Sequence, residues 1–178
     1  MTNHQLAQLN IATLLAPLES PQLADFVDNL GRINALAEQS DGFVWRWDES
    51  YDLDGDAAAN GSDPKAPTHP FGDDVVVNLS VWRDVAALQA FAFRSDHVEI
   101  VRRRREWFAK MDQAYMVLWW VPDGHRPSIT EAAERLSMLR ERGPSVDAFA
   151  FRDAFAPPMA AERRADPSFG AAQNPLAE

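Results

Sequence analysis

Two asparagines, a serine and an arginine occupy positions from which they could act together on a small molecule. Asn10, Asn78, Ser80 and Arg46 are even-numbered residues of segments in which apolar side chains recur every second position. Because side chains alternate across a strand, all four are expected on one face of a sheet. Amide N–H groups and a guanidinium can hold an enolate or phenolate oxygen and favour its one-electron reaction with dioxygen. The alternative is that these groups only satisfy one another across a subunit interface.

Three large side chains share this parity and could bind a flat substrate. Trp82, Trp120 and Met116 are expected on the same face, where they would pack against an aromatic ring. The pattern therefore predicts an oxygenase of small molecules that acts without a cofactor. A noncatalytic homodimer that binds a small molecule or haem is the alternative, and a purely structural partner protein is a third hypothesis.

One histidine could ligate a metal. His97 lies between Asp96 and Glu99 in a segment with helical periodicity. Imidazole titrates near neutrality, so His97 could be the axial ligand of a haem or an acid/base residue. A lone helical histidine is more often a hydrogen-bonded structural residue. No cofactor is expected unless haem binds through His97.

Several kinds of chemistry are excluded or disfavoured. The chain has no cysteine, which excludes disulfides, thiolate metal sites and cysteine nucleophiles. No Ser-His-Asp order, glycine-rich phosphate loop or zinc spacing is present. Asp52, Asp54 and Asp56 resemble the opening of a calcium loop, but Ala57 and Asp63 stand where that loop needs glycine and glutamate.

The charge of the chain bears on its partners. The net charge is −10, so the overall field repels polyanions and disfavours nucleic acid. Arg94 and Arg102 to Arg105 depart from this trend; they are interpreted as a solvated helix face, with an anion site as the alternative. Met1 to Gln8 lacks a basic and apolar leader pattern, and no apolar run approaches the roughly 20 residues of a membrane span. We expect a cytoplasmic protein without membrane contact.

Apolar periodicity predicts the elements that position these side chains. Strands are expected over 6–14, 42–47, 75–82 and 115–121, and helices over 20–41, 84–111 and 128–143. For the helix over 84–111, a break near Ser95 and Asp96 is the alternative. Ser20 before Pro21 is expected to cap the first helix, and the capping box from Ser128 to Glu131 to open the third. The order predicts an α+β fold: a ferredoxin-like β-α-β-β-α-β antiparallel sheet with an extra C-terminal helix and both main helices on one face. We expect one domain over 1–150 with an exposed loop at 49–74, and a C-terminal tail over 151–178.

The two sheet faces differ in polarity. One face is apolar and should meet the helices: Leu9, Ile11, Phe43, Trp45, Trp47, Val75, Val77, Leu79, Val81, Tyr115, Val117, Trp119 and Val121. The other mixes polar and apolar groups: Gln8, Asn10, Val44, Arg46, Val76, Asn78, Ser80, Trp82, Met116, Leu118 and Trp120. That second face is too apolar to stand in water. An identical subunit is expected to cover it and leave a lumen between the sheets; the third helix or the tail is the alternative cover.

Motifs along the chain resemble one family. They are 6–11 (LAQLNI), 41–46 (DGFVWR), 78–82 (NLSVW), 93–97 (FRSDH), 102–108 (RRRREWF) and 119–122 (WWVP). Over about residues 6–151 the chain resembles the bacterial family called domain of unknown function 3291. The resemblance implies a dimeric α/β barrel, the architecture of antibiotic-biosynthesis and small haem-degrading monooxygenases. Asn10 resembles the strand asparagine of the haem-degrading enzymes, whereas their helical tryptophan has no counterpart and His97 comes earlier than their histidine.

Overall fold

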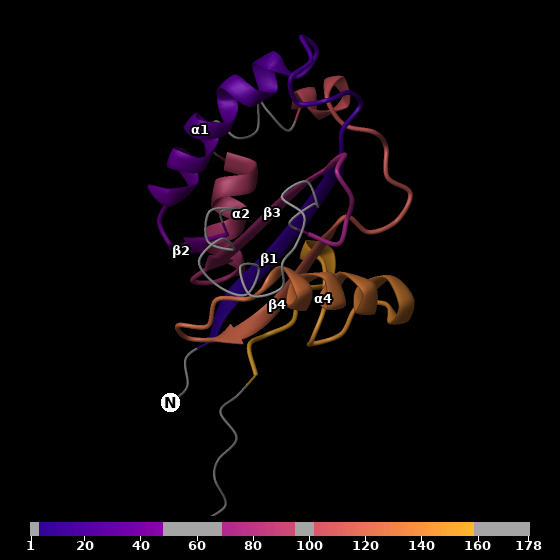
Figure 1. Cartoon of the computed structure of the whole chain (residues 1–178). Helices are drawn as coiled ribbons and strands as arrows, with labels where there is room; N and C mark the ends of the chain where they lie inside the picture. The colour runs from indigo at the N-terminus through magenta and orange to yellow at the C-terminus, as the bar shows by residue number, and fades with distance from the viewer. Residues whose placement is uncertain (1–3, 48–68, 95–101, 159–178) are drawn as a thin grey trace, which may run out of the picture.

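The chain folds as a mixed α+β structure built on one sheet (Figure 1). The structure is a computed structural model, and it describes residues 4–47, 69–94 and 102–158. In chain order the elements are β1 (His4–Thr13), α1 (Ala24–Glu38), β2 (Phe43–Arg46), β3 (Val75–Trp82), α2 (Val85–Arg94), the 3-10 turn η3 (Arg104–Glu106), β4 (Met116–Pro122), α4 (Ile129–Arg142) and the 3-10 turn η4 (Phe151–Asp153). None of the helices in these ranges has the length and apolar character needed to cross a bilayer.

The four strands form an antiparallel sheet in the order β2-β3-β1-β4. The long central pair, β1 with β3, sets the register, with Leu9 opposite Leu79 and Asn10 opposite Asn78. Even-numbered residues of β1 therefore lie opposite even-numbered residues of β3. The same parity holds between β1 and β4, where Asn10 lies opposite Met116. We call the two sides of the sheet the odd face and the even face.

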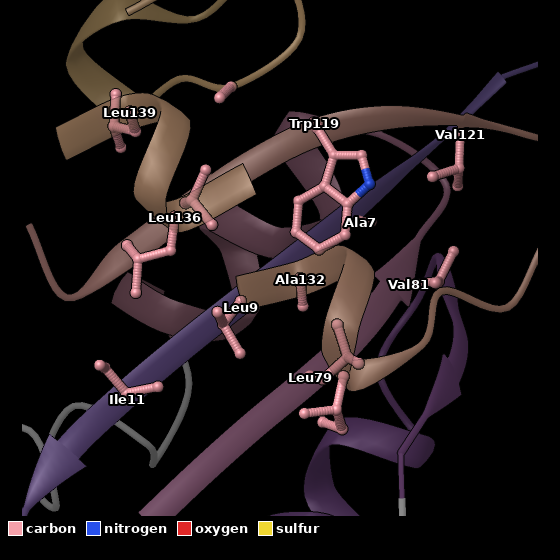
Figure 2. Packing of buried hydrophobic residues seen from close by; sticks show 13 residues of the cluster. Ala7, Leu9, Ile11, Leu79, Val81, Trp119, Val121, Ala132, Leu136 and Leu139 are labelled. Atoms are coloured by element: carbon pink, nitrogen blue, oxygen red, sulfur yellow. The ribbon is translucent and has the colours of Figure 1, made fainter. Parts of the chain in front are cut away.

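The odd face forms an apolar core beneath α4. Leu9, Leu79 and Trp119 are almost fully buried there, together with Ala132 and Leu136 of α4. Figure 2 shows these α4 side chains lying over the side chains of β1, β3 and β4. The pattern Ile129, Ala132, Leu136, Leu139 recurs every three or four residues, so one stripe of α4 supplies this cover.

The even face is covered by α1, α2 and the chain beyond α4. Leu6, Trp82 and Leu118 are buried against the side chains of Ile33, Leu36 and Ala37 from α1, Ala87, Leu88 and Phe91 from α2, and Phe149 and Phe151. In Figure 1, α4 lies on the other side of the sheet from α1 and α2. The expected assignment of helices to faces was thus wrong: the main helices meet the mixed face, and α4 meets the apolar one. Periodicity identifies residues that share a face but not the helix that covers them.

Strand β2 breaks the expected parity. Phe43 lies opposite Trp82 and Trp45 lies opposite Val81, so the register shifts between these two residues. At such an irregularity an extra residue in one strand interrupts the regular alternation of side chains between the two faces of the sheet. Phe43 therefore packs edge-on against Trp82 on the even face, with ring centroids 5.3 Å apart, while Trp45 joins the odd-face core. The prediction that Phe43 shares a face with Trp45 was wrong for this reason.

Of the two predicted helix caps, the one at the start of α4 is confirmed and the one at the start of α1 is wrong. Ser128 caps α4 as expected, because its Oγ accepts a hydrogen bond from the Glu131 backbone N–H at 3.1 Å. Ser20 does not cap α1, which begins at Ala24 without a side-chain cap. The Leu23 backbone N–H instead donates to the Ser20 carbonyl at 3.0 Å in a turn before the helix.

The long second helix expected over 84–111 is wrong at its C-terminal end. Helix α2 ends at Arg94, residues 95–101 lie outside the described part of the chain, and Trp107 to Met111 are not helical. The Leu15 N–H donates to the Trp107 carbonyl at 2.9 Å, so this segment runs beside the end of β1. Arg103 pairs with Asp25 and Glu106, and its guanidinium lies 4.8 Å from the Trp107 ring centroid.

Candidate functional site

The described residues of the predicted site all belong to strands around one region of the sheet. Their register forms three adjacent rows: Met116, Asn10 and Asn78; then Leu118, Gln8, Ser80 and Arg46; then Trp120, Leu6, Trp82 and Phe43. His97 lies outside the described residues, so its role as a haem ligand stays a prediction.

Four neutral polar side chains lie side by side in the middle of the even face. We call Gln8, Asn10, Asn78 and Ser80 the polar strip; Gln8 is opposite Ser80, and Asn10 is opposite Asn78. Apolar clusters flank the strip along the strands, one containing Leu6 and Trp82 and the other containing Val76. The strip thus interrupts a face that is otherwise closed by packing.

Exposure increases along the strip. Gln8 and Ser80 are each 5% exposed, Asn10 is half-buried and Asn78 is exposed. A burial gradient of this kind joins interior hydrogen-bonding groups to the molecular surface. Asn78 is therefore the end of the strip that lies at the surface.

The buried half of the strip contains a chain of hydrogen bonds. Trp82 Nε1–H donates to Ser80 Oγ at 2.9 Å, and Ser80 Oγ–H donates to Gln8 Oε1 at 2.8 Å. All three side chains are at least 95% buried. Since buried polar groups are costly unless paired, these bonds fix the three side chains relative to one another.

The outer half of the strip is different. Within residues 4–47, 69–94 and 102–158, neither the Asn10 nor the Asn78 side chain makes a hydrogen bond. Each carboxamide offers two N–H donors and one acceptor oxygen. The amide pair can therefore hold an oxygen atom of a ligand without breaking a bond within the protein.

The two tryptophans of the predicted site are engaged by protein side chains. The Trp82 ring stacks on Phe91, with centroids 5.1 Å apart, and is 1% exposed. Trp120 Nε1–H donates to the Phe155 carbonyl at 2.9 Å. Of the three predicted substrate-binding residues, half-buried Met116 is the one opposite Asn10.

Arg46 points its charge toward α1. Its Nε donates to Glu38 Oε1 at 2.7 Å, and Nη1 donates to the Trp47 carbonyl at 3.4 Å. The backbone of Arg46 lies opposite Ser80, as the sequence pattern implied. Its guanidinium nevertheless neutralises a carboxylate at the end of α1 instead of facing the amides.

Sequence reasoning did not single out two groups of polar residues. Gln8 was placed on the mixed face but not in the site, because its bond to Ser80 depends on the cross-strand register. On the odd face, Glu131 accepts from Trp119 Nε1–H at 2.9 Å, and its second oxygen lies 2.8 Å from His125 Nε2. In the described ranges, no three His, Asp or Glu side chains are grouped to hold a metal ion.

The architecture and the polar strip define an α+β protein whose antiparallel sheet lies between two helical layers, with hydrogen-bonding groups beneath one layer. The family model described as Domain of unknown function (DUF3291) matches residues 5–165, and the chain belongs to this family. The resemblance to this family stated from the sequence motifs is thereby confirmed, and the match continues past Phe151.

Other comparisons add little to this assignment. The chain is similar to the crystal structure of a protein of unknown function from Nitrosomonas europaea, with 13% sequence identity and a TM-score of 0.42. The alignment covers 72% of this chain and 97% of that one. The search of curated proteins found no match.

Proposed function

We propose that this chain binds a small, flat aromatic molecule against the polar strip and oxidises it as a cofactor-independent monooxygenase. The observation that carries the proposal is the Asn10 and Asn78 pair, opposite each other and without side-chain hydrogen bonds in the described part of the chain. Amide donors aimed at a phenolate oxygen favour the anion that reacts with dioxygen. The strand order and antiparallel pairing also support a ferredoxin-like domain.

The reaction expected at such a site is the conversion of an activated methylene to a carbonyl. The substrate first gives one proton to solvent and binds as the anion. Dioxygen takes one electron from this anion, the resulting radicals combine as a peroxide on the methylene carbon, and the peroxide takes up a proton from solvent. Loss of water then forms the C=O bond. The carbon loses two hydrogens and four electrons, one oxygen atom enters the product, and the other leaves as water with both hydrogens.

Binding without turnover is the second candidate function. It is favoured by the neutral character of the polar strip, in which none of the four side chains titrates near neutrality. The guanidinium of Arg46, whose backbone lies opposite Ser80, is paired with Glu38. These four side chains can hold an acceptor oxygen, but none of them is an acid or a base.

Oxygen consumption separates the two candidates. Purified protein is incubated with anthrone, a flat phenol tautomer with an activated methylene, in an oxygen electrode. Turnover should fall about 100-fold in Asn78→Ala, the order of effect seen when one oxyanion donor is removed. Gln113→Ala removes an exposed amide elsewhere and should retain full activity. Anthrone that binds with equal affinity to the protein and to Asn78→Ala, without oxygen uptake, would contradict both candidates.

The homodimer expected from the sequence stays a prediction. The expectation that an identical subunit covers the even face was wrong, because α1 and α2 of the same chain lie there; with α4 on the odd face, a dimer would have to use a surface other than these two faces. Sedimentation equilibrium at micromolar concentration measures the mass. A single-chain mass would contradict the barrel dimer while leaving the strip unaffected.

A further inference from the structure

The hydrogen bonds of the polar strip determine the orientation of the Gln8 carboxamide. An indole N–H can only donate, so Ser80 Oγ must accept from Trp82. The Ser80 hydroxyl has a single proton, and Gln8 lies 2.8 Å away. If the Gln8 amide were turned around, its N–H would donate to the second lone pair of Ser80 Oγ, and the buried hydroxyl proton would lose the acceptor it has in the described part of the chain.

The Gln8 amide nitrogen is consequently a donor without a partner in the protein. Its oxygen is occupied by Ser80, and Nε2 makes no hydrogen bond to the residues in the described ranges. The Gln8 side chain is nevertheless 95% buried. Buried donors are rarely left unpaired, and such a group calls for an explanation. Nε2 is not among the fully enclosed unpaired atoms, so it borders accessible space.

We infer that Gln8 Nε2–H is the specificity-determining donor of the strip, and that it selects ligands with a second acceptor oxygen. The inference rests on the proposed binding of a ligand at Asn10 and Asn78. Gln8 and Asn10 are two positions apart on β1 and point to the same face, so their Cα atoms are about 7 Å apart. One oxygen of a rigid aromatic ligand is held by the asparagines and another by Gln8. Ser80 and Trp82 are positioning residues that hold the Gln8 amide.

Two ligands with similar ring systems but different numbers of oxygen atoms isolate the contact with Gln8 Nε2–H. The probes are 2-naphthol, which has one oxygen, and 2-hydroxy-1,4-naphthoquinone, which has three on a ring system of the same size. The ratio of their dissociation constants is measured by isothermal titration for the full chain and its variants. A merely structural defect weakens both probes together, whereas loss of a specific donor changes the ratio.

Gln8→Glu and Gln8→Met test the donor in two ways. Glutamate still accepts from Ser80 but has no amide N–H, and methionine has similar length without polar groups. Each should weaken the quinone about tenfold, the equivalent of one hydrogen bond, and leave 2-naphthol unchanged. Gln113→Glu makes the same chemical change at an exposed position and should leave the ratio intact. An unchanged ratio in both Gln8 variants overturns the inference.

Ser80→Ala tests the positioning role. The Gln8 amide loses its fixed orientation, so the quinone should weaken by a smaller factor than in Gln8→Met while 2-naphthol is unaffected. A quinone affinity equal to that of the unmodified chain overturns the role of Ser80.

Hydrogen exchange of the Gln8 side-chain amide in the ligand-free protein is an independent test of whether this donor is free. The Gln8 side-chain N–H signals, assigned by their absence in Gln8→Glu, should exchange with solvent faster than the Trp82 indole N–H. Slow, protected Gln8 signals would reveal another acceptor and overturn the inference. Failure of both naphthalene probes to bind counts against the proposed function, whereas the exchange rate still decides whether Gln8 carries a free donor.

Discussion

The odd and even faces of the sheet are both covered by helices, yet they are built differently. Beneath α4, the odd face is closed by side chains such as Leu9, Leu79 and Trp119, which are almost fully buried. Beneath α1 and α2, apolar packing is confined to two clusters with the polar strip between them. A polar row within a covered face adds little to stability, because hydrogen bonds within the protein only offset the free energy lost when its groups leave water.

Together with the proposed function, the difference predicts that the odd face mainly provides stability and that the outer strip provides ligand binding. The odd face has the composition of a plain core, and substitutions there should change the free energy of unfolding. The outer strip residues contribute unpaired amides at a partly exposed position, so substitutions there should change binding instead. Neighbouring residues on one strand allow the two roles to be separated.

Leu9→Ala and Asn10→Ala should show the largest contrast. Leu9 is fully buried on the odd face, whereas Asn10 is half-buried on the even face. Leu9→Ala leaves a cavity and should lower the free energy of unfolding by about 3 kcal/mol, and Asn10→Ala should lower it by less than about 0.5 kcal/mol. Urea denaturation measures both. Equal destabilisation by the two substitutions would remove the distinction between the faces.

Gly42→Ala should be the next largest effect and tests the helical layer over the even face. Gly42 has φ +82°, and a Cβ there would lie 2.5 Å from the Cβ of Ala87 in α2. Backbone strain and the clash together should cost about 3 kcal/mol in unfolding free energy. Gly124→Ala is the matched control, because Gly124 has φ +81° but no atom within 4 Å of such a Cβ. It should cost only about 1 kcal/mol, and a cost equal to that of Gly42→Ala would show that the approach of α2 is unimportant.

Ser128→Ala should weaken the cover of the odd face by a smaller amount. It removes the side-chain acceptor for the Glu131 backbone N–H at the start of α4. Loss of an N-cap should lower the free energy of unfolding by about 1 kcal/mol. Ser128→Asp retains a capping oxygen and should restore most of it. Denaturation of both variants in urea gives the comparison, which fails if the aspartate variant is as unstable as the alanine variant.

Much of the sheet was predictable because β1, β3 and β4 alternate regularly. The parity of Asn10, Asn78, Ser80 and Trp82 followed from the local sequence, and so did the Ser128 cap. Strand β2 was less predictable, since Phe43, Trp45 and Trp47 fit a regular strand equally well. The register shift that sends Phe43 to the even face depends on its packing against Trp82.

The remaining wrong predictions concern contacts between residues that are far apart in the sequence, which hydrophobic periodicity does not reveal. Trp107 and Phe108 fit a helical stripe, but they bury their rings beside the end of β1 and against Phe26. Likewise, the importance of Gln8 depends on its position opposite Ser80, seventy-two residues away in the chain. Residue type indicates what a side chain can bond, and register decides which partner it meets.

The smallest expected effect concerns pH and the cap of α2. Asp84 Oδ1 accepts from the Ala87 backbone N–H at 2.8 Å, and this bond holds the pKa of the Asp84 carboxyl below its ordinary value, with Arg83 acting in the same direction. A pKa that is lower in the folded state means that the contribution to stability is complete above the unfolded pKa of about 3.9 and is lost as the pH falls through the folded value. Because Asp84 is partly exposed, we expect a loss of about 0.5 kcal/mol.

Asp84→Asn supplies the control, because asparagine caps a helix without titrating in this range. Subtracting its unfolding free energy from that of the unmodified chain removes the contribution of Asp41, whose pKa is also lowered by the adjacent Arg83. The difference between the two proteins should therefore shrink as the pH falls below about 3.9, the unfolded pKa of aspartate. Ser128 caps α4, the helix over the odd face, and does not titrate. The difference in unfolding free energy between Ser128→Ala and the unmodified chain should therefore be independent of pH. A flat difference for Asp84→Asn would mean that the two helical layers respond to acid alike.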